Sequence, residues 1–295
     1  MRFDVITLFP ELFAPFLTAG ITRRAYASGQ VDVHLWNPRD HAEGNYRRVD
    51  DRPFGGGPGM VMMAEPLERC LNHIRDQRGE ALDTQAPLVL FSPIGRKLNH
   101  AEVEGWSASA GAILLCGRYE GVDQRFIDAH VTVQLSLGDF VLSGGEIAAL
   151  ALLDAVARLQ PGVLSDEGSH QFDSFNPALD GLLDCPHYTR PEEWAGRAVP
   201  APLMSGHHAQ IERWRRDQRL LITARHRPDL IDAARAAGAL QPAGGRTRQI
   251  ALTGYNGRLF DPLAGRFVRG FTSAKPERQS RRSHLWRGQD RWIST

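Results

Sequence analysis

The sequence predicts an α/β fold with a mainly parallel sheet, followed by a smaller helical domain. Short runs rich in Val, Ile, Leu and Phe alternate with helical stretches through the first half of the 295-residue chain. This alternation is typical of parallel strands joined by helices that cover both faces of a sheet. The second half lacks the alternation and contains an arginine-rich helical segment.

The expected strands are apolar runs bounded by turn residues. They span residues 3–8, 31–36, 87–91, 112–116 and 131–135. Helices are expected between them, for example at residues 65–78 and 99–110. A further helix is expected at residues 145–160, because this apolar segment begins after a glycine pair and ends at Pro161-Gly162.

Composition divides the chain into four segments. Residues 1–163 form the expected α/β domain, and the polar stretch at residues 164–180 is the expected linker. Residues 181–240 form the expected helical domain, in which Ser205 caps one helix and Pro228 begins a second. Residues 241–295 form a basic extension, expected to be flexible, with some hairpin character at residues 253–267.

The net charge of +1 is unevenly distributed. Residues 241–295 hold ten Arg and one Lys against two Asp and one Glu, a net charge of +8, which leaves −7 on the first 240 residues. A basic extension favours a polyanionic partner, although a solvated tail has the same composition. Three cysteines, no signal-peptide pattern and no apolar run of about 20 residues predict a cytoplasmic protein that does not enter a membrane.

Three glycine-bearing loops each follow a predicted strand, at residues 91–97, 116–121 and 135–146. In an open parallel sheet, ligands bind beyond the carboxyl ends of the strands, so these loops are expected to converge on one crevice. Their glycines would let backbone groups approach a ligand closely, although each glycine alone is equally consistent with a simple turn. The phosphate-binding fingerprints of ATP and NAD proteins are absent, which favours a nucleotide without a phosphate chain.

Other clusters remain ambiguous from the residues alone. Arg47, Arg48 and Arg52 flank a glycine-rich stretch and suit phosphate contacts in a mobile lid, or a solvated turn in which aspartates pair with them. The arginine-rich segment at residues 211–219 suits an RNA backbone or an ordinary surface helix. The cysteine and histidine spacings match no common zinc site. Arg158 could simply pair with Asp154, four residues earlier.

Four motifs, taken in order, are more specific than any one of them. They read VDDRPFGGGPGM at residues 49–60, LLCGRYEGVD at 114–123, LGDFVLSGGE at 137–146 and GLLDCPHYTRP at 181–191. In this order they closely resemble the bacterial tRNA (guanine-N1)-methyltransferase family, over residues 1 to about 230. The resemblance implies the SPOUT methyltransferase fold, an α/β domain with a C-terminal trefoil knot that forms the cofactor site, which is an exception to the rule against knots.

The same resemblance implies the reaction and its participants. S-adenosylmethionine would donate a methyl group to N1 of guanosine 37 in the anticodon stem-loop of tRNAs that carry G at position 36. The enzyme would be a homodimer with active sites at the interface, and its activity would depend on Mg²⁺.

Site residues follow from the matching positions. The loops that would hold S-adenosylmethionine contain Ser92, Pro93, Gly117, Tyr119, Glu120, Gly121, Ser136, Leu137, Gly138, Asp139, Phe140, Val141, Leu142, Gly144 and Gly145. Asp173 matches the general base, which would reach the site from the second subunit, and Arg158 matches its partner, which would stabilise charge on guanine O6. Positions that match the tRNA site are Asp50, Gly55, Gly57, Gly59, Ser174, His187, Tyr188 and Arg190.

Three alternative functions are weighed against this interpretation. A related RNA methyltransferase acting on ribose or rRNA is disfavoured by the Asp-Ser-Phe triplet at residues 173–175 and by the last motif. An RNA-binding protein without catalysis is disfavoured by the presence of Asp173, Arg158 and the loop glycines. A kinase or dehydrogenase is disfavoured by the missing phosphate-binding fingerprints. Residues 241–295 resemble nothing in the family.

Overall fold

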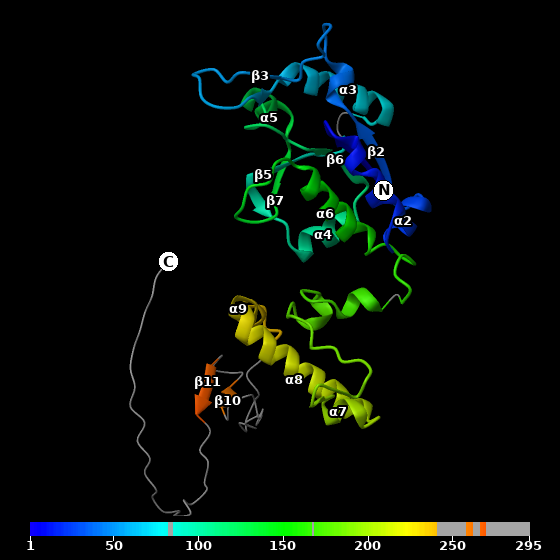
Figure 1. Cartoon of the computed structure of the whole chain (residues 1–295), viewed down its shortest axis with the longest axis vertical. Helices are drawn as coiled ribbons and strands as arrows, with labels where there is room; N and C mark the ends of the chain where they lie inside the picture. The colour runs from blue at the N-terminus through cyan, green and yellow to red at the C-terminus, as the bar shows by residue number, and fades with distance from the viewer. Residues whose placement is uncertain (82–84, 167, 241–257, 262–265, 270–295) are drawn as a thin grey trace, which may run out of the picture. The chain divides into compact units, whose positions relative to one another are not determined.

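The computed structural model describes residues 1–81, 85–166, 168–240, 258–261 and 266–269. These residues form two compact units, Met1–Asp184 and Cys185–Thr295 (Figure 1). The division falls near the expected change from an α/β to a helical domain. The segment boundaries predicted at residues 163, 180 and 240 remain predictions.

A five-stranded parallel sheet forms the centre of the first unit (Figure 1). Its strands, in spatial order, are β2 (Asp32–Trp36), β1 (Arg2–Ile6), β6 (Gly111–Leu115), β5 (Leu88–Lys97) and β7 (Val133–Ser136). Every neighbouring pair is parallel. The predicted α/β class with a parallel sheet is therefore confirmed, and each predicted strand is present with its ends displaced by a few residues, apart from β5, which extends further.

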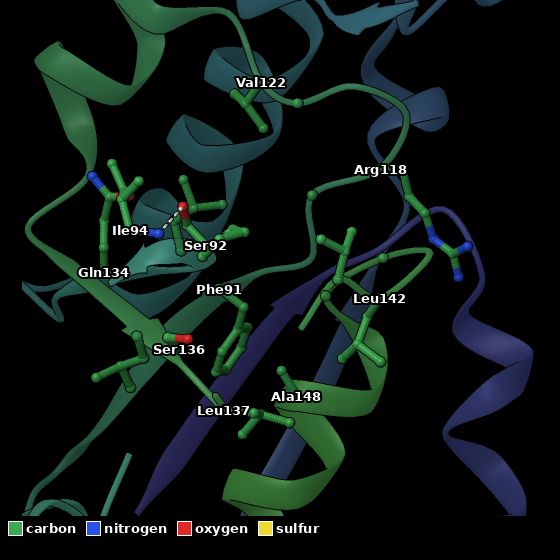
Figure 2. Close-up of a pocket in the computed structure, with 18 of the residues that line it drawn as sticks. Phe91, Ser92, Ile94, Arg118, Val122, Gln134, Ser136, Leu137, Leu142 and Ala148 are labelled. Carbon is green, nitrogen blue, oxygen red and sulfur yellow. Dashed lines mark hydrogen bonds between the residues drawn. The ribbon is translucent and has the colours of Figure 1, made fainter. Parts of the chain in front are cut away.

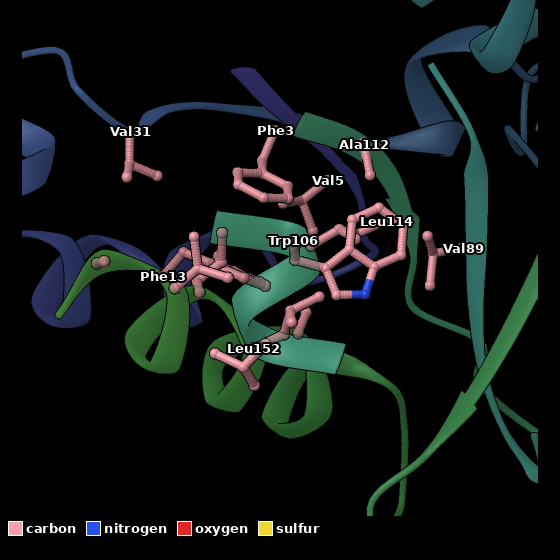
Figure 3. Packing of buried hydrophobic residues seen from close by; sticks show 14 of the residues in the cluster. Phe3, Val5, Phe13, Val31, Val89, Trp106, Ala112, Leu114 and Leu152 are labelled. Carbon is pink, nitrogen blue, oxygen red and sulfur yellow. The ribbon is translucent and has the colours of Figure 1, made fainter. Parts of the chain in front are cut away.

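Helices cover both faces of this sheet. On one face lie α3 (Ala64–Arg78) and α5 (Gln124–His130), and on the other lie α4 (His100–Ser107) and α6 (Glu146–Ala157). Alternate residues of β6 enter different hydrophobic clusters, with Leu114 facing α4 and α6 and Ile113 facing α3. Figure 3 shows the first cluster, in which Trp106 of α4 packs near Leu114. A sheet buried on both faces accounts for the continuous apolar runs in the sequence.

Strand β5 pairs twice with β7. Phe91 is opposite Leu135, and after the intervening residues Arg96 is opposite Leu135 again, followed by Lys97 opposite Ser136. Gly95 lies so close to β7 that a Cβ there would be 2.5 Å from the backbone of Leu135. The strand predicted to end at residue 91 therefore continues to Lys97, because the pairing is irregular between Phe91 and Arg96 and then resumes with β7.

The remaining elements of the first unit are short. They are η1 (Pro10–Leu12), α1 (Ala14–Thr18), α2 (Arg23–Ala27), η2 (Pro38–His41), β3 (Asp50–Asp51), β4 (Val61–Met62), η3 (Ser169–Phe172) and η4 (Pro177–Leu179). β3 and β4 form a small antiparallel pair around the glycine-rich stretch. η3 and η4 lie in the predicted linker, which therefore contains local helical turns.

The second unit contains α7 (Ala201–Met204), α8 (His208–His226) and α9 (Pro228–Ala236), with the short strands β8 (Glu193–Trp194) and β9 (Arg197–Ala198). The helix start at Pro228 is confirmed. The prediction that Ser205 caps the start of the arginine-rich helix, α8, was wrong. Ser205 ends α7, where its hydroxyl donates to the carbonyl of Pro202, and His207 is the residue that precedes α8.

Two antiparallel strands, β10 (Arg258–Asp261) and β11 (Arg266–Arg269), agree with the hairpin character predicted for residues 253–267. The rest of the extension at residues 241–295, and its expected flexibility, lie outside the described residues. Among the described residues, no helix has both the length and the apolar character needed to cross a membrane.

Candidate functional site

Residues 90–94 of β5 and the loops that follow β6 and β7 surround one cavity of about 360 Å³ (Figure 2). The two loops begin at the carboxyl ends of the parallel strands that flank β5, where ligands bind in open α/β sheets, whereas the predicted loop at residues 91–97 is part of β5. The convergence predicted from the three glycine-bearing loops is therefore present in the first unit.

Most of the predicted cofactor residues line this cavity. They are Ser92, Pro93, Gly117, Tyr119, Glu120, Gly121, Ser136, Leu137, Gly138, Phe140, Val141, Leu142, Gly144 and Gly145. Asp139 is not among the lining residues, and its carboxylate instead pairs with Lys97 at 2.9 Å on the surface. These residues lie beside the cavity, and their contact with a cofactor stays a prediction.

The cavity wall combines apolar side chains with backbone groups. Its base is formed by strand residues that include Leu90 and Leu135, which are almost fully buried. The loops themselves touch, since the backbone N–H of Gly145 donates to the carbonyl of Gly117 at 3.0 Å. A Cβ on Gly145 would lie 2.7 Å from the Cα of Cys116. Only glycine permits this approach, which brings the start of α6 against the β6 loop.

Several lining residues were not predicted from the sequence. Phe91 and Gln134 lie within strands, and Arg118, Val122 and Ser143 lie within or beside the family motifs without having been assigned a role. Strand residues near a carboxyl end look like any other core position in a sequence pattern. Their adjacency to a predicted binding loop was the one signal that could have identified them.

The glycine-rich segment at residues 52–60 is tied to the β6 loop. The N–H of Glu120 donates to Met60 O at 2.9 Å, and the N–H of Met62 donates to Gly121 O at 2.8 Å. Gly59 has a left-handed backbone (φ +77°), and a Cβ there would overlap the side chain of Glu120. Gly57 and Gly59 help to line a second hollow, while Gly55 belongs to the same loop without lining it. Two segments predicted to serve different ligands thus form one connected structure.

Asp50 lies beside Tyr119. Burial raises the pKa of the Tyr119 phenol, and a hydrogen bond with the Asp50 carboxylate raises it further, whereas Arg39 opposes these effects. The Arg39 Nη2 atom donates to the phenol oxygen at 3.4 Å. The phenol therefore stays protonated at neutral pH and is available as a hydrogen-bond donor at the rim of the cavity.

Arg158 and Asp173 form an ion pair within the first unit. Arg158 caps the end of α6, Asp173 follows η3, and Arg158 Nη1 donates to Asp173 Oδ2 at 2.6 Å. Both side chains are about one-third exposed, at 34% and 35%. The carboxylate partner of Arg158 is thus Asp173 rather than Asp154. Neither residue lines the cavity of its own chain. Ser174 accepts a hydrogen bond from the Asp184 N–H at 3.0 Å.

The other predicted tRNA residues, His187, Tyr188 and Arg190, lie in the second unit. The Tyr188 ring packs edge-on against Trp214 of α8, with ring centroids 6.0 Å apart. On α8, the arginine-rich helix, Glu212 pairs with Arg215 at 2.8 Å and with Arg219 at 3.8 Å. Among the described residues no group of three or more His, Cys, Asp or Glu side chains could hold a metal ion.

Comparison with known proteins gives consistent matches. The family model described as "tRNA (Guanine-1)-methyltransferase TrmD" matches residues 1–233. A protein of Paracidovorax citrulli named tRNA (guanine-N(1)-)-methyltransferase is 77% identical over 259 residues, which cover 88% of this chain and 100% of that protein. A protein with the same name from Polaromonas sp. is 74% identical, over a match that covers 81% of this chain and 93% of that protein. The corresponding protein of Bordetella pertussis is 58% identical, over a match that covers 82% of this chain and 95% of that protein.

Proposed function

The chain belongs to the tRNA (guanine-1)-methyltransferase family, and we propose that it methylates N1 of guanosine 37 in tRNAs with G at position 36. The observation that carries this proposal is the cavity beside β5 and the carboxyl ends of β6 and β7, which two of the four family motifs help to line. Its product is a modified tRNA, so the enzyme acts in the cytoplasm, where tRNA is used.

The cavity suits the adenosyl part of S-adenosylmethionine. Its volume of about 360 Å³ lies within the range of small-molecule sites, and its lining includes both apolar side chains and glycines. Backbone amides and carbonyls can read a purine edge and ribose hydroxyls without a phosphate-binding loop. When bound, S-adenosylmethionine supplies an electrophilic methyl group on a sulfonium.

Asp173 and Arg158 supply the remaining chemistry. N1 of guanine carries a proton at neutral pH, and a carboxylate within hydrogen-bond reach can accept it as N1 attacks. The Arg158 guanidinium stabilises the negative charge that develops on O6. Both side chains are partly exposed, so a guanine base can reach them, and the 2.6 Å ion pair between them in the single chain would open if they act from different subunits.

The active enzyme is a homodimer in which Asp173 serves the cavity of the second subunit. This arrangement is supported by the incomplete site of the single chain, since Asp173 does not line its own cavity. Mixing Arg158→Ala and Asp173→Ala chains tests it. If the two residues act from different subunits, each mixed dimer has one intact site, and random mixing restores about one quarter of wild-type activity.

If both residues act from the same chain, every site in the mixture lacks one of them, and the mixture stays inactive. As a control, the two variants carry tags of different mass, and light scattering gives the molecular mass of each variant alone and of the mixture. Dimers of intermediate mass in the mixture show that the subunits have exchanged.

The α/β domain contains a trefoil knot. The double pairing of β5 with β7 supports it, since Phe91 and Arg96 both lie opposite Leu135, as they would if the intervening chain crossed that strand. The crossing residues Ser92, Pro93 and Ile94 also line the cavity, which favours a knot at the cofactor site. A knotted backbone resists local opening, and this would keep the loops preorganised for the cofactor.

The tRNA backbone is held by basic side chains of both units. In the first unit Arg48 and Arg52 flank the glycine-rich segment, and in the second α8 carries Arg213, Arg215, Arg216 and Arg219. Among the described residues no cluster of three or more His, Cys, Asp or Glu side chains could hold a metal ion, and no step of the reaction is assigned to Mg²⁺. A dependence on Mg²⁺ would act through the enzyme or through the folded RNA.

The defining experiment uses radiolabelled S-adenosylmethionine and two anticodon stem-loops, one with G at position 36 and one with A. We expect label at N1 of guanosine 37 in the first RNA alone. The Asp173→Asn variant should lose turnover by about a hundredfold or more while it binds the cofactor normally, because it removes the base and keeps the shape. Equal labelling of both RNAs would refute the specificity, and wild-type turnover of Asp173→Asn would refute the assigned base.

A further inference from the structure

An ion pair between Arg118, which lines the cavity, and the buried Glu146 joins three segments of the chain. Glu146, the first residue of α6, has a side chain only 1% exposed, and that of Arg118, in the β6 loop, is 17% exposed. The Arg118 Nε atom lies 3.1 Å from Glu146 Oε1 and 2.9 Å from Oε2. The hydroxyl of Thr7, just after β1, donates to the same Oε1 atom at 2.9 Å.

Arg118 also holds the loop between β7 and α6. Its Nη1 atom donates to the carbonyl of Ser143 at 3.2 Å, and its guanidinium carbon lies 4.4 Å from the centre of the Phe9 ring. A Cβ on Gly144 would overlap Arg118 Nε and lie 2.6 Å from Glu146 Oε2. Figure 2 shows the Arg118 side chain extending away from Ser92 and Ser136, toward the loop after β1.

We infer that Glu146 and Thr7 are positioning residues that act through Arg118 to hold the two glycine loops of the cofactor site at a fixed spacing. Neither Glu146 nor Thr7 is among the residues that line the cavity. This inference rests on the proposed function, because it assigns the spacing to the binding of S-adenosylmethionine.

The physical reason lies in the burial of the charge. A carboxylate at 1% exposure depends on its counter-ion and its hydrogen-bonded partners, which favours the observed position of Arg118. That position determines where Ser143 and the loop before α6 can lie. Backbone groups that recognise a ligand must stay within about 0.5 Å of their productive geometry. A displaced Arg118 would therefore weaken cofactor binding without removing any group that contacts the cofactor.

The first test compares two substitutions of Thr7, measured by calorimetric titration of the full-length protein with S-adenosylmethionine. Thr7→Val keeps the shape and removes the hydroxyl, whereas Thr7→Ser keeps the hydroxyl. We expect Thr7→Val to raise the Kd several-fold and Thr7→Ser to leave it within about twofold of wild type. Because Thr7 does not line the cavity, a change that follows the hydroxyl reports its two bonds, the one that it donates to Glu146 and the one that it accepts from the Phe9 N–H at 3.0 Å.

The second test is Glu146→Gln, with Asp4→Asn as a matched control. Asp4 is also fully buried and ion-paired, with Arg78 at 2.6 Å, but it lies in the middle of β1 and does not line the cavity. Both substitutions change a buried paired carboxylate to its amide and should lower the Tm. Only Glu146→Gln should raise the Kd for S-adenosylmethionine, by about tenfold to a hundredfold, while Asp4→Asn stays within about twofold.

Turnover separates positioning from catalysis. With S-adenosylmethionine at saturation, kcat of Glu146→Gln should approach the wild-type value, and the defect should appear in KM. An equal loss of affinity in Glu146→Gln and Asp4→Asn, or in Thr7→Val and Thr7→Ser, would overturn the inference. If Glu146→Gln does not fold, the Thr7 pair decides. If the wild-type protein itself fails to bind S-adenosylmethionine, the proposed function is wrong, and the inference falls with it.

Discussion

Replacing Gly145 with alanine would insert a methyl group between α6 and the β6 loop. The new Cβ would lie 2.7 Å from the Cα of Cys116 and 3.2 Å from the N of Gly117, whereas an ordinary contact begins near 3.4 Å. The helix or the loop would have to move by about 0.7 Å. Cys116 is fully buried, and both sides of the contact are backbone, so a side-chain rotation cannot relieve it.

The expected loss of stability follows from this overlap. Overpacking a rigid interior costs about 1–3 kcal/mol, and we expect about 2 kcal/mol here, since the Gly145–Gly117 hydrogen bond is strained by the same shift. For a unit of this size that corresponds to a decrease of about 4–8 °C in Tm. The displacement also separates two loops of the cavity, so the Kd for S-adenosylmethionine should rise by about tenfold or more.

Gly105→Ala is the matched control, measured in parallel by calorimetry and cofactor titration. Gly105 is an exposed residue within α4, and a Cβ there meets nothing within 4 Å. Alanine should therefore stabilise the helix by about 0.5–1 kcal/mol and leave cofactor affinity unchanged. A Gly145→Ala protein that matches wild type in both Tm and Kd would refute the argument that close approach, rather than a turn, requires this glycine.

The remaining predictions concern stability, thiol chemistry and RNA binding. Among the described residues the buried Tyr26 hydroxyl has no hydrogen-bond partner, so Tyr26→Phe should be neutral or stabilising by up to about 1 kcal/mol; a clearly lower Tm would show a partner that matters. Burial, chiefly, raises the pKa of the Cys70 thiol to about 12, so the native protein should resist alkylation at Cys70 at pH 8 and react when unfolded in urea. Because the pKa of Cys70 is raised in the folded protein, its contribution to the free energy of unfolding is complete below the ordinary thiol pKa and is lost as pH rises toward 12. Rapid alkylation of Cys70 in the native protein at pH 8 would contradict the raised pKa and this pH dependence. Deleting residues 241–295 removes a net charge of +8, so tRNA affinity should fall and depend less steeply on salt, while kcat is retained. The log–log slope should decrease by about 0.9 for each phosphate that the extension neutralises in the intact protein, and identical slopes would exclude a role in RNA binding.

Local patterns in the sequence were sufficient for the α/β class and for the approximate position of each strand. An apolar run such as residues 112–116 can be buried on both faces only in a covered parallel sheet, and the observed β6 has both faces buried. The glycine-bearing loops were placed together correctly because the carboxyl ends of parallel strands share one edge. Ser205 was misassigned, because its hydroxyl suits the end of α7 as well as the start of α8, and local sequence does not distinguish these roles.

Contacts between distant segments were decided by the tertiary structure. The second pairing of β5 with β7 requires Gly95 to lie against Leu135, 40 residues later in the chain. The choice of Asp173 over Asp154 as the partner of Arg158 depends on where the linker turns back. The burial of Glu146 beside Arg118 and Thr7 has no local signature, because the three residues meet only when β1, β6 and α6 are assembled. The sequence by itself determined which segments are apolar, which turn and which carry charge, because those properties are local. Tertiary structure alone decided which charges meet and which glycines have no space for a side chain, because both depend on distances between segments far apart in the chain.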